Sequence, residues 1–538
     1  MATDRLSDLP HDLLQHILSF APAREAAASA ILSRQWRPLW RRTSAVNLDT
    51  RPYLPANSKG EHHRLRSSPL DAFFYDALAA LAAVPRRTPL KRLTLYLVLD
   101  GSTNGGADYA EPRDGHMVAN ILAADSATAQ LEELIIGCRY DSPKYGLPLA
   151  SMTCAATLRV LELEQCKLQP PSAPSLAFPR LTDLRLRNCF FMEGYLQAMV
   201  DAAPALTSLL LINVAQKPLE PLDPADDILY YDMPTYRRLP LRLRCLTGTV
   251  LELEAYPQKH ELQAYGHIGI QLDMPSLRSF RYHGRSLKLS LISPAPGLAR
   301  VDVDATYKGD LPWSLYEPMP PMLTSFSTTR ALKLTISAIK DILDGEKEHG
   351  GVILPTFPNL KLLHLDVIHE HESSSSMALS MARLLRSCPA MSELRLMMWW
   401  NYNYLLEGEN KDPGTTPFAQ SMDRFEMLAS KASSRSNSKV SELPAALSDN
   451  CASFTGLQTS LRKVTLLFNT KEVDCFQVQL AKFLVENAMV LEEMHIDDGN
   501  QFWPEHIRHK LARWRAESFR ARNLPDTAGF QVHQLNLW

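Results

Sequence analysis

The sequence predicts an α/β protein in which a small helical module precedes a long solenoid of stacked repeats. Three observations support this. A leucine pattern returns roughly every 25 residues, prolines stand at a fixed place in that pattern, and the first fifty residues have helical periodicity. Because one repeat cannot bury its own apolar face, the stacking of neighbouring repeats must create the core.

The composition is that of a folded globular chain. Of 538 residues, 45% are hydrophobic and 22% are charged, and the formal net charge is −2. This balance gives no overall attraction to nucleic acid or to an anionic membrane. Glycine is scarce (22 residues) and proline abundant (37), and neither GxGxxG nor GxxxxGK[ST] occurs. We therefore expect no nucleotide cofactor, and no other cofactor is indicated.

Residues 6–20 place apolar side chains at helical spacing, and Pro22 should end this helix. Residues 24–32 (REAAASAIL) should form a second short helix. The next ten residues hold two tryptophans and four arginines. Because about 40 residues rarely bury enough apolar surface to be stable alone, we expect a partner to complete this module.

Residues 4–48 contain four motifs in a characteristic order: Leu9-Pro10, Ile17-Leu18-Ser19, Leu32-Ser33-Arg34-x-Trp36 and Leu39-Trp40. In their order and spacing, these motifs resemble the F-box of plant F-box proteins. The resemblance implies three helices that dock on a Skp-type adaptor and, through it, on a cullin ubiquitin ligase. It assigns the adaptor contact to Leu9, Pro10, Ile17, Leu18, Leu32, Ser33, Trp36, Leu39 and Trp40. The alternative is that these side chains pack against the rest of the chain.

Four arginines follow this pattern, and Asp49 is the one acid near them. They are Arg34, Arg37, Arg41 and Arg42. Such a run is either a solvated face or a surface that steers association with an acidic adaptor.

The body of the chain repeats Leu158-x-x-Leu161-x-Leu163-x-x-Cys166, with a second copy from Leu181 to Cys189. Starts at 131, 158, 181 and 206 are separated by 27, 23 and 25 residues, which are leucine-rich-repeat periods. Leucines two apart point to one face of a strand, so we expect an irregular solenoid with a parallel strand ladder over residues 70–400. The cysteines should be buried thiols in stacked turns rather than redox or metal sites.

Seven prolines stand two positions before the first apolar residue of a repeat. They are Pro179, Pro204, Pro275, Pro296, Pro321, Pro358 and Pro389. Proline cannot extend a helix and favours an extended residue before it, so each should end a return segment and start the next strand. The 71 residues from Pro204 to Pro275 should hide two degenerate repeats.

Polar stretches mark the boundaries between these parts. Residues 49–69 read as a linker, and residues 101–116 as a mobile loop. Residues 401–450 are rich in Ser, Asn, Lys and Pro and are expected to be a disordered insert.

Residues 452–522 form a last block of strand (461–468), helix (475–487) and strand (491–496), followed by a helix at 504–522. The stretches SLRKVTL, LAKFLVENA and VLEEMHI resemble the FBD-type domain that accompanies F-box and leucine-rich segments in plants. The final helix has one apolar and one basic face. It should cap the solenoid, and nucleic-acid binding is the alternative.

No pattern indicates catalysis or a metal site. His369-Glu370-His371 lacks a third ligand at helical spacing, and neither GxSxG nor HExxH occurs. We therefore expect a non-enzymatic, intracellular protein of the nucleus or cytoplasm, with no membrane span. It should bind a Skp-type adaptor through its F-box and an unknown target protein through its repeats. A repeat scaffold without a ligase role remains the alternative.

Overall fold

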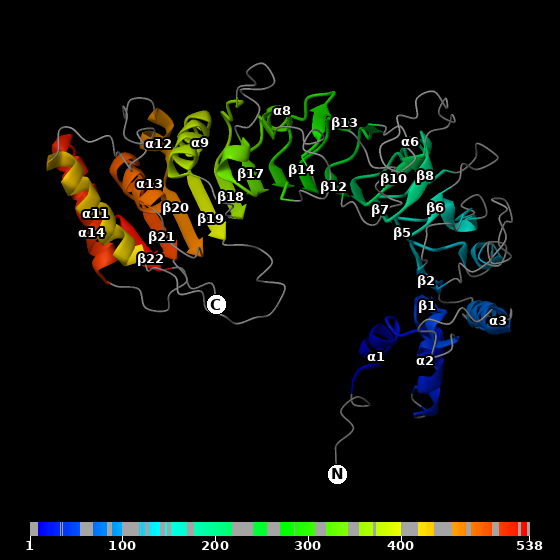
Figure 1. Cartoon of the computed structure of the whole chain (residues 1–538). Coiled ribbons are helices and arrows are strands. Elements are labelled where there is room, and N and C mark those ends of the chain that lie inside the picture. The colour runs from blue at the N-terminus through cyan, green and yellow to red at the C-terminus, as the bar shows by residue number, and fades with distance from the viewer. Residues whose placement is uncertain are drawn as a thin grey trace, which may run out of the picture. The chain divides into compact units, whose positions relative to one another are not determined.

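Parallel strands run side by side through each of the two units into which the chain divides, Met1–Pro275 and Ser276–Trp538 (Figure 1). The computed structural model describes residues 9–32, 34, 36–53, 68–82, 89–98, 118, 120–123, 128–139, 146–147, 152–168, 177–217, 240–255, 269–284, 286–306, 319–342, 354–368, 373–399, 418–434, 454–469, 475–497, 505–525 and 529–534. Each unit is described by itself below.

In the first unit, a parallel ladder carries one strand from each successive repeat. Its strands are, in order, β1 (Ala45–Asp49), β2 (Arg92–Val98), β3 (Glu133–Arg139), β5 (Val160–Glu164), β7 (Asp183–Arg187), β9 (Ser208–Ile212) and β12 (Val250–Ala255). A second, shorter sheet consists of β4 (Gly146–Leu147), β6 (Lys167–Leu168), β8 (Phe190–Met192) and β10 (Ala215–Lys217), and β11 (Leu241–Arg244) pairs with β13 (Gly269–Asp273). The helices are α1 (His11–Leu18), α2 (Ala23–Ala28), α3 (Ser68–Ala82) and α6 (Tyr195–Asp201), with 3-10 turns η1 (Ser29–Ile31), η2 (Trp40–Arg42), η3 (Arg51–Tyr53) and η5 (Thr153–Ala156).

The second unit repeats this plan. Its ladder runs β14 (Ser279–Gly284), β16 (Arg300–Asp304), β17 (Ala331–Ile336), β18 (Leu362–Ile368), β19 (Glu393–Trp399), β20 (Lys463–Asn469), β21 (Glu493–Asp497) and β22 (Gln531–Gln534), and β15 (Lys288–Leu291) lies outside it. The helices are α8 (Met319–Thr324), α9 (Ser374–Ser387), α11 (Phe418–Ser434), α12 (Thr455–Ser460), α13 (Cys475–Asn487) and α14 (Glu505–Ala521), with one 3-10 turn, η8 (Ile339–Ile342). The expected strand–helix–strand block is therefore present, and its strands continue the ladder.

The ladder is parallel and in register, and many of its strands, such as β2, β5, β7 and β18, alternate a buried with a half-exposed side chain. Leu134, Leu161, Leu184, Leu209 and Leu251 are paired from strand to strand and are all buried. Burying a leucine fully stabilises a fold by about 1.5–3 kcal/mol, so this column is a continuous source of stability along the unit. The prediction that the repeat leucines share one face is confirmed.

The backbone carbonyl of the residue just before each strand joins that strand to the next; each ladder strand, with the residue before it, is called a rung. The carbonyl of Arg159 accepts hydrogen bonds from two successive amides of the next rung, Thr182 (2.9 Å) and Asp183 (3.0 Å), and the pattern recurs along both ladders. In the first unit, threonine hydroxyls reinforce it: Thr182 donates to Arg159 O, Thr207 to Thr182 O and Thr249 to Thr207 O, each at 3.1 Å. Threonine suits this place for two reasons. Its hydroxyl finds an acceptor in the preceding repeat, and its β-branched side chain favours extended backbone.

The strands of the central repeats end in a stacked turn. Gln165, Asn188 and Asn213 adopt left-handed φ angles of 55°, 51° and 49°, a conformation that asparagine tolerates better than most residues. The next residues, Cys166 and Cys189, are fully buried, as expected. Burial raises the pKa of the Cys189 thiol to about 12, and the pKa of Cys166 is raised by a hydrogen bond to the Cys138 thiol and by burial. Both thiols are therefore packing groups.

Six of the seven prolines stand four residues before the first residue of a ladder strand. Each is the second residue of a β-turn. For example, Leu181 N donates to Phe178 O across Pro179, at 3.2 Å. Proline suits this place because its fixed φ matches the second residue of such turns. The prediction for the remaining proline, Pro321, is wrong. It lies within α8, near the start of the helix, where a missing N–H costs nothing.

Several boundaries differ from the sequence expectation. The ladder begins with β1, inside the span expected to be F-box and before the expected linker, and the third F-box helix is reduced to turns that include η2. Between Pro204 and Pro275, the described residues supply one ladder strand, β12, beyond β9 of the repeat that starts at Leu206, where two further repeats were expected. Residues 54–67, residues 101–116 and the His369-Glu370-His371 motif lie outside the described residues.

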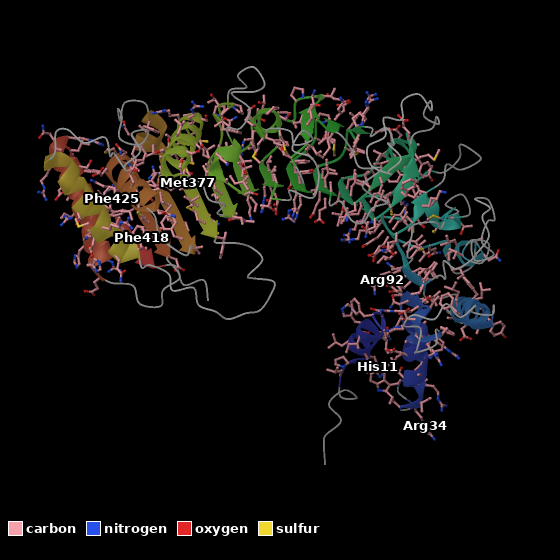
Figure 2. The ribbon with its side chains drawn as sticks, in the orientation of Figure 1. His11, Arg34, Arg92, Met377, Phe418 and Phe425 are labelled. Carbon is pink, nitrogen blue, oxygen red and sulfur yellow. The ribbon has the colours of Figure 1, made fainter. Side chains whose placement is uncertain are left out.

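The insert at 401–450 is not wholly disordered, because residues 418–434 form α11. Phe418 stacks on Phe468 of β20, with ring centroids 5.7 Å apart, and Phe425 meets Trp514 of α14 at 6.4 Å. Figure 2 shows both phenylalanines on this helix. The residues around them are polar, so the composition of the insert did not predict that Phe418 and Phe425 pack against the ladder and α14. The rest of the insert lies outside the described residues.

Candidate functional site

The N-terminal module has a small core of its own. Leu14, Leu18, Ala26, Trp36 and Leu39 are buried together, and Leu9, Ala21 and Trp40 pack against them. Three residues that the resemblance assigned to the adaptor contact, Leu18, Trp36 and Leu39, are therefore buried inside the module. They hold it together and are not exposed to a partner.

Outside this core, the module exposes five large apolar side chains, which together are called the apolar patch. It consists of Leu13 (50% exposed), Ile17 (46%), Phe20 (62%), Ile31 (87%) and Leu32 (72%). Ile17 and Leu32 were in the expected set, as was Pro10, which is also exposed. Leu13, Phe20 and Ile31 were missed, although Leu13 and Ile17 are four apart on one helix. Ser33 lies outside the described residues.

The ends of α1 fix the direction in which this patch points. Pro10 precedes the helix, and its carbonyl accepts hydrogen bonds from Leu13 N (3.0 Å) and Leu14 N (3.1 Å). At the other end, the Ser19 hydroxyl donates to His16 O at 2.6 Å. The helix therefore places Leu14 and Leu18 inward and Leu13 and Ile17 outward, so it is apolar on two faces.

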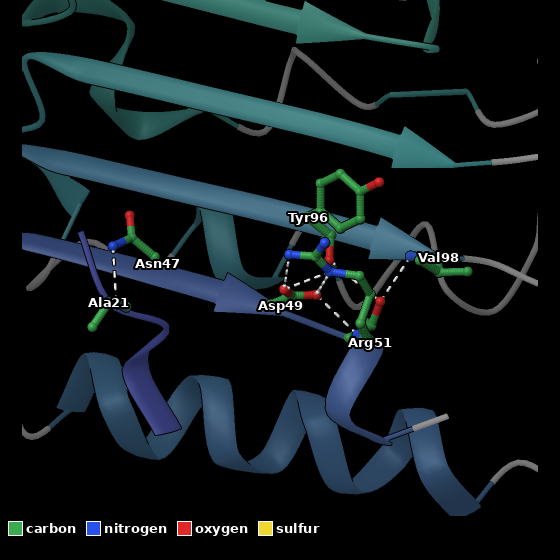
Figure 3. Close-up of polar contacts among 7 residues, drawn as sticks. Ala21, Asn47, Asp49, Arg51, Tyr96 and Val98 are labelled. Atoms are coloured by element: carbon green, nitrogen blue, oxygen red, sulfur yellow. Dashed lines mark hydrogen bonds and ion pairs between the residues drawn. The ribbon is translucent and has the colours of Figure 1, made fainter. Parts of the chain in front are cut away.

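Side chains from the first two ladder strands attach the module to the repeats, and Figure 3 shows the contact of Asn47 with Ala21. Asn47 Nδ2, on β1, donates to Ser19 O (2.8 Å) and to Ala21 O (3.0 Å) in the turn between α1 and α2. Arg92, on β2, donates to Ser19 O at 2.7 Å, and its guanidinium lies 5.0 Å from the centroid of the Phe20 ring. One residue of the exposed patch is thus supported directly by the ladder.

A second set of contacts anchors the end of β1. The Asp49 carboxylate accepts three hydrogen bonds from the Arg51 guanidinium, at 3.1, 2.8 and 2.6 Å, and this pairing raises the arginine pKa. The guanidinium also lies 4.6 Å from the centroid of the Tyr96 ring on the next strand (Figure 3). Two separate sets of contacts therefore hold this region: one joins the module to the first two strands, and the other joins the end of β1 to β2.

The half-exposed face of the first ladder is the second surface of interest. Adjacent strands present Glu162 and Glu164, then Arg185 and Arg187, then Leu210 and Ile212, then Glu252 and Glu254, all in register. Glu162 ion-pairs with Arg187 (3.2 Å) and Arg185 (3.5 Å). The face therefore alternates charged and apolar stripes, which suits a protein partner.

The corresponding face of the second ladder carries histidine–carboxylate pairs. His283 lies 3.2 Å from Asp304, and Asp366 contacts both Lys333 (2.8 Å) and His364 (2.9 Å). Burial acts to raise the pKa of Asp366, but the hydrogen bonds from His364 and Lys333 outweigh it and the net pKa is lowered. The carboxylate thus stays ionised on a mixed polar surface.

The basic C-terminal helix is largely occupied by contacts within the unit. Lys510 ion-pairs with Asp423 and Glu426 of α11, and Arg513 with Glu426. Arg515 is buried and donates to four carbonyls after and at the end of α13, among them Ala488 O at 3.0 Å. These contacts favour the capping role over nucleic-acid binding.

The described ranges contain neither a metal-binding cluster nor a membrane-spanning helix. Within them, no group of three or more His, Cys, Asp or Glu side chains is arranged to hold a metal ion. Over the same residues, no helix combines the length and apolarity needed to cross a membrane.

Comparison with known proteins agrees with this architecture. Residues 6–44 match the F-box domain family, and residues 120–220 match the leucine-rich repeats of the family described as FBD-associated F-box protein At5g56370. F-box protein At3g59000 of Arabidopsis thaliana is 31% identical over 39% of this chain and 40% of its own length. The meiotic F-box protein MOF of Oryza sativa subsp. japonica is 28% identical over 39% and 41%. The chain thus spans about two fifths of the length of these two relatives.

A third relative matches over most of both chains. The F-box/FBD/LRR-repeat protein At1g51370 of Arabidopsis thaliana is 22% identical over 76% of this chain and 78% of its own length. The F-box match coincides with the module that exposes the apolar patch, and the repeat match falls on the first ladder. In its domains and in their order, the chain is similar to the plant F-box/leucine-rich-repeat proteins of the FBD-associated type.

Proposed function

We propose that this protein is the substrate-recognition subunit of a Skp-cullin-F-box ubiquitin ligase. F-box/leucine-rich-repeat proteins serve in general as substrate adaptors without catalytic activity of their own. The observation that carries the proposal is the exposed apolar patch of Leu13, Ile17, Phe20, Ile31 and Leu32. It lies outside the core that the F-box module already fills.

The patch needs a partner for a physical reason. Five large apolar side chains exposed on a module of about 40 residues are costly in water, and exposed apolar surface of this kind marks a protein interaction site. A Skp-type adaptor would bury them, at roughly 25 cal/mol for each Å² of apolar surface removed from water. The neighbouring arginines would act at the rim, where charge affects association rate more than affinity.

The ladders would supply the target-binding surface. Their half-exposed faces carry charged, apolar and histidine side chains in register, and the contacts of Asn47 and Arg92 tie the first of these faces to the F-box. Tethering a target there raises the effective concentration of its lysines near a ubiquitin-loaded enzyme, so no catalytic residue is required in this chain. The complex would act in the nucleus or cytoplasm.

The decisive experiment is co-purification with a Skp-type adaptor. The Leu13→Asp/Ile17→Asp variant should lose the adaptor, because a carboxylate would be forced into a desolvated interface. Leu246→Asp is the matched control, since Leu246 is equally exposed (50%) but lies in the repeats. It should retain the adaptor. Failure of the unmodified protein to bind any Skp-type adaptor would refute the proposal.

A second experiment separates ligase function from simple scaffolding. Proximity labelling with an F-box-deleted form should trap targets, and the half-life of those targets should lengthen relative to cells with the intact protein. Unchanged half-lives would favour the alternative of a repeat scaffold without a ligase role.

A further inference from the structure

A polar pocket of about 300 Å³ opens at the edge of the first ladder where β3, β5 and β7 begin. It is lined by Gln130, Glu132, Thr157, Arg159 and Arg180. Glu132 and Arg159 are the residues that directly precede β3 and β5, and Arg180 follows Pro179 in the turn before β7. Three consecutive rungs therefore build the pocket, and the backbone bonds between rungs hold it.

The charges in this pocket are not balanced. Arg159 and Arg180 are both exposed, and within the described residues neither guanidinium hydrogen-bonds or ion-pairs with another group. The one carboxylate, Glu132, is paired with Lys91 at 3.0 Å. Because Lys91, outside the lining, neutralises Glu132, the two pocket arginines leave a net local charge of +2. By contrast, Arg185 and Arg187 on the adjacent face both ion-pair with Glu162.

The remaining lining groups define what can bind. The Thr157 hydroxyl donates to Leu131 O at 2.7 Å, and the Arg159 amide donates to Glu132 O at 2.7 Å, so both donors are already used. The donors left are two guanidinium forks and the Gln130 amide. Guanidinium forks match the oxygens of phosphate with paired N–H···O bonds, and a charge of +2 matches a phosphate dianion.

We propose that this pocket binds a phosphoryl group, carried by a phosphorylated serine or threonine in a target segment that lies along the ladder. A phosphoseryl group carries −1.5 to −2 charge at neutral pH and offers three acceptor oxygens. An aspartate or glutamate would leave part of the positive charge uncompensated. Only the source of the phosphoryl group rests on the proposed function, because the binding chemistry does not involve the F-box.

The test uses the purified full-length chain and three probes: inorganic phosphate, a pool of random peptides with a central phosphoserine, and the same pool with serine. Phosphorus NMR line broadening and fluorescence anisotropy measure binding. The phosphoserine pool should bind at least tenfold more tightly than the serine pool, and more tightly than inorganic phosphate. In Arg159→Ala/Arg180→Ala, that preference should fall at least tenfold. Arg330→Ala removes an exposed arginine at the equivalent place before β17 and should leave the preference unchanged.

Three outcomes would overturn the proposal. The double variant could bind the phosphoserine pool as well as the unmodified protein, or Arg330→Ala could weaken binding equally, which would mean a diffuse charge effect. Inorganic phosphate could also bind as tightly as the peptides, which would make the pocket a site for a free anion. Adaptor co-purification on the same variants keeps the two proposals apart, because Arg159→Ala/Arg180→Ala should still bind the adaptor.

Discussion

Replacing Asn47 with alanine should loosen the F-box from the repeats without unfolding either. The Asn47 side chain donates to Ser19 O and Ala21 O, at 2.8 and 3.0 Å, and so joins β1 to the turn between α1 and α2. Each such bond contributes about 0.5–1.5 kcal/mol net, so losing both costs about 1–3 kcal/mol. An equilibrium shifts roughly 5- to 150-fold over that range, which sets the expected rise in local opening.

Hydrogen exchange of the turn amides is the direct assay. Phe20 N and Ala21 N are bonded to Ile17 O and Leu18 O, at 3.1 and 3.2 Å, and both should exchange faster in Asn47→Ala. Amides of the ladder should be unaffected. The matched control is Gln197→Ala. Like Asn47, Gln197 makes two hydrogen bonds to the backbone, in its case both to Arg244, elsewhere in the same unit.

The result that would refute this reasoning is equal exchange of the turn amides in Asn47→Ala and in the unmodified protein. The Arg92 contacts alone would then suffice to hold the turn. Faster exchange throughout the unit would also contradict it, because Asn47 would then stabilise the whole unit rather than the attachment of the F-box.

Three further predictions concern the ladders. Arg515→Met should cost about 3 kcal/mol or more, because the four carbonyls that Arg515 satisfies lose their donor, and the denaturation midpoint should fall relative to the exposed control Arg520→Met. Thr207→Val keeps the β-branched shape but removes the hydroxyl bond to Thr182 O, so calorimetry should show a loss of about 1 kcal/mol, and no loss would mean that the hydroxyl ladder is passive. The Cys189 thiol has a pKa raised to about 12 from 9.0, so the fold favours its protonated form. Its contribution is complete below pH 9 and is lost as pH rises toward 12, at about 1.4 kcal/mol per pH unit, and alkylation of Cys189 should require unfolding up to pH 9.

The regular part of the fold was predictable because its causes are local. Alternating leucines can satisfy burial only as strands that share one face, and proline restricts its own φ and the residue before it. Leu161, Leu163 and Pro179 therefore lie where the sequence places them. Pro321 shows the limit of such local reasoning. A proline before an apolar residue suits the first turn of a helix as well as the turn before a strand. The helix at 418–434 shows another limit, since its stability comes from contacts with Phe468 and Trp514 that lie far away in sequence.

The candidate site also combines features that the sequence predicts with features that depend on tertiary packing. The sequence by itself determined that an F-box module with leucine-rich repeats is present, and that apolar residues of the module must be buried by something. Only the tertiary structure decided which of them the module buries itself. Leu18 and Ile17 are neighbours of equal hydrophobicity on one helix, yet Leu18 is in the core and Ile17 is exposed. The physical reason is that hydrophobicity belongs to a side chain, whereas burial depends on which elements pack around it, and that packing also placed Arg159 and Arg180 in one pocket from separate repeats.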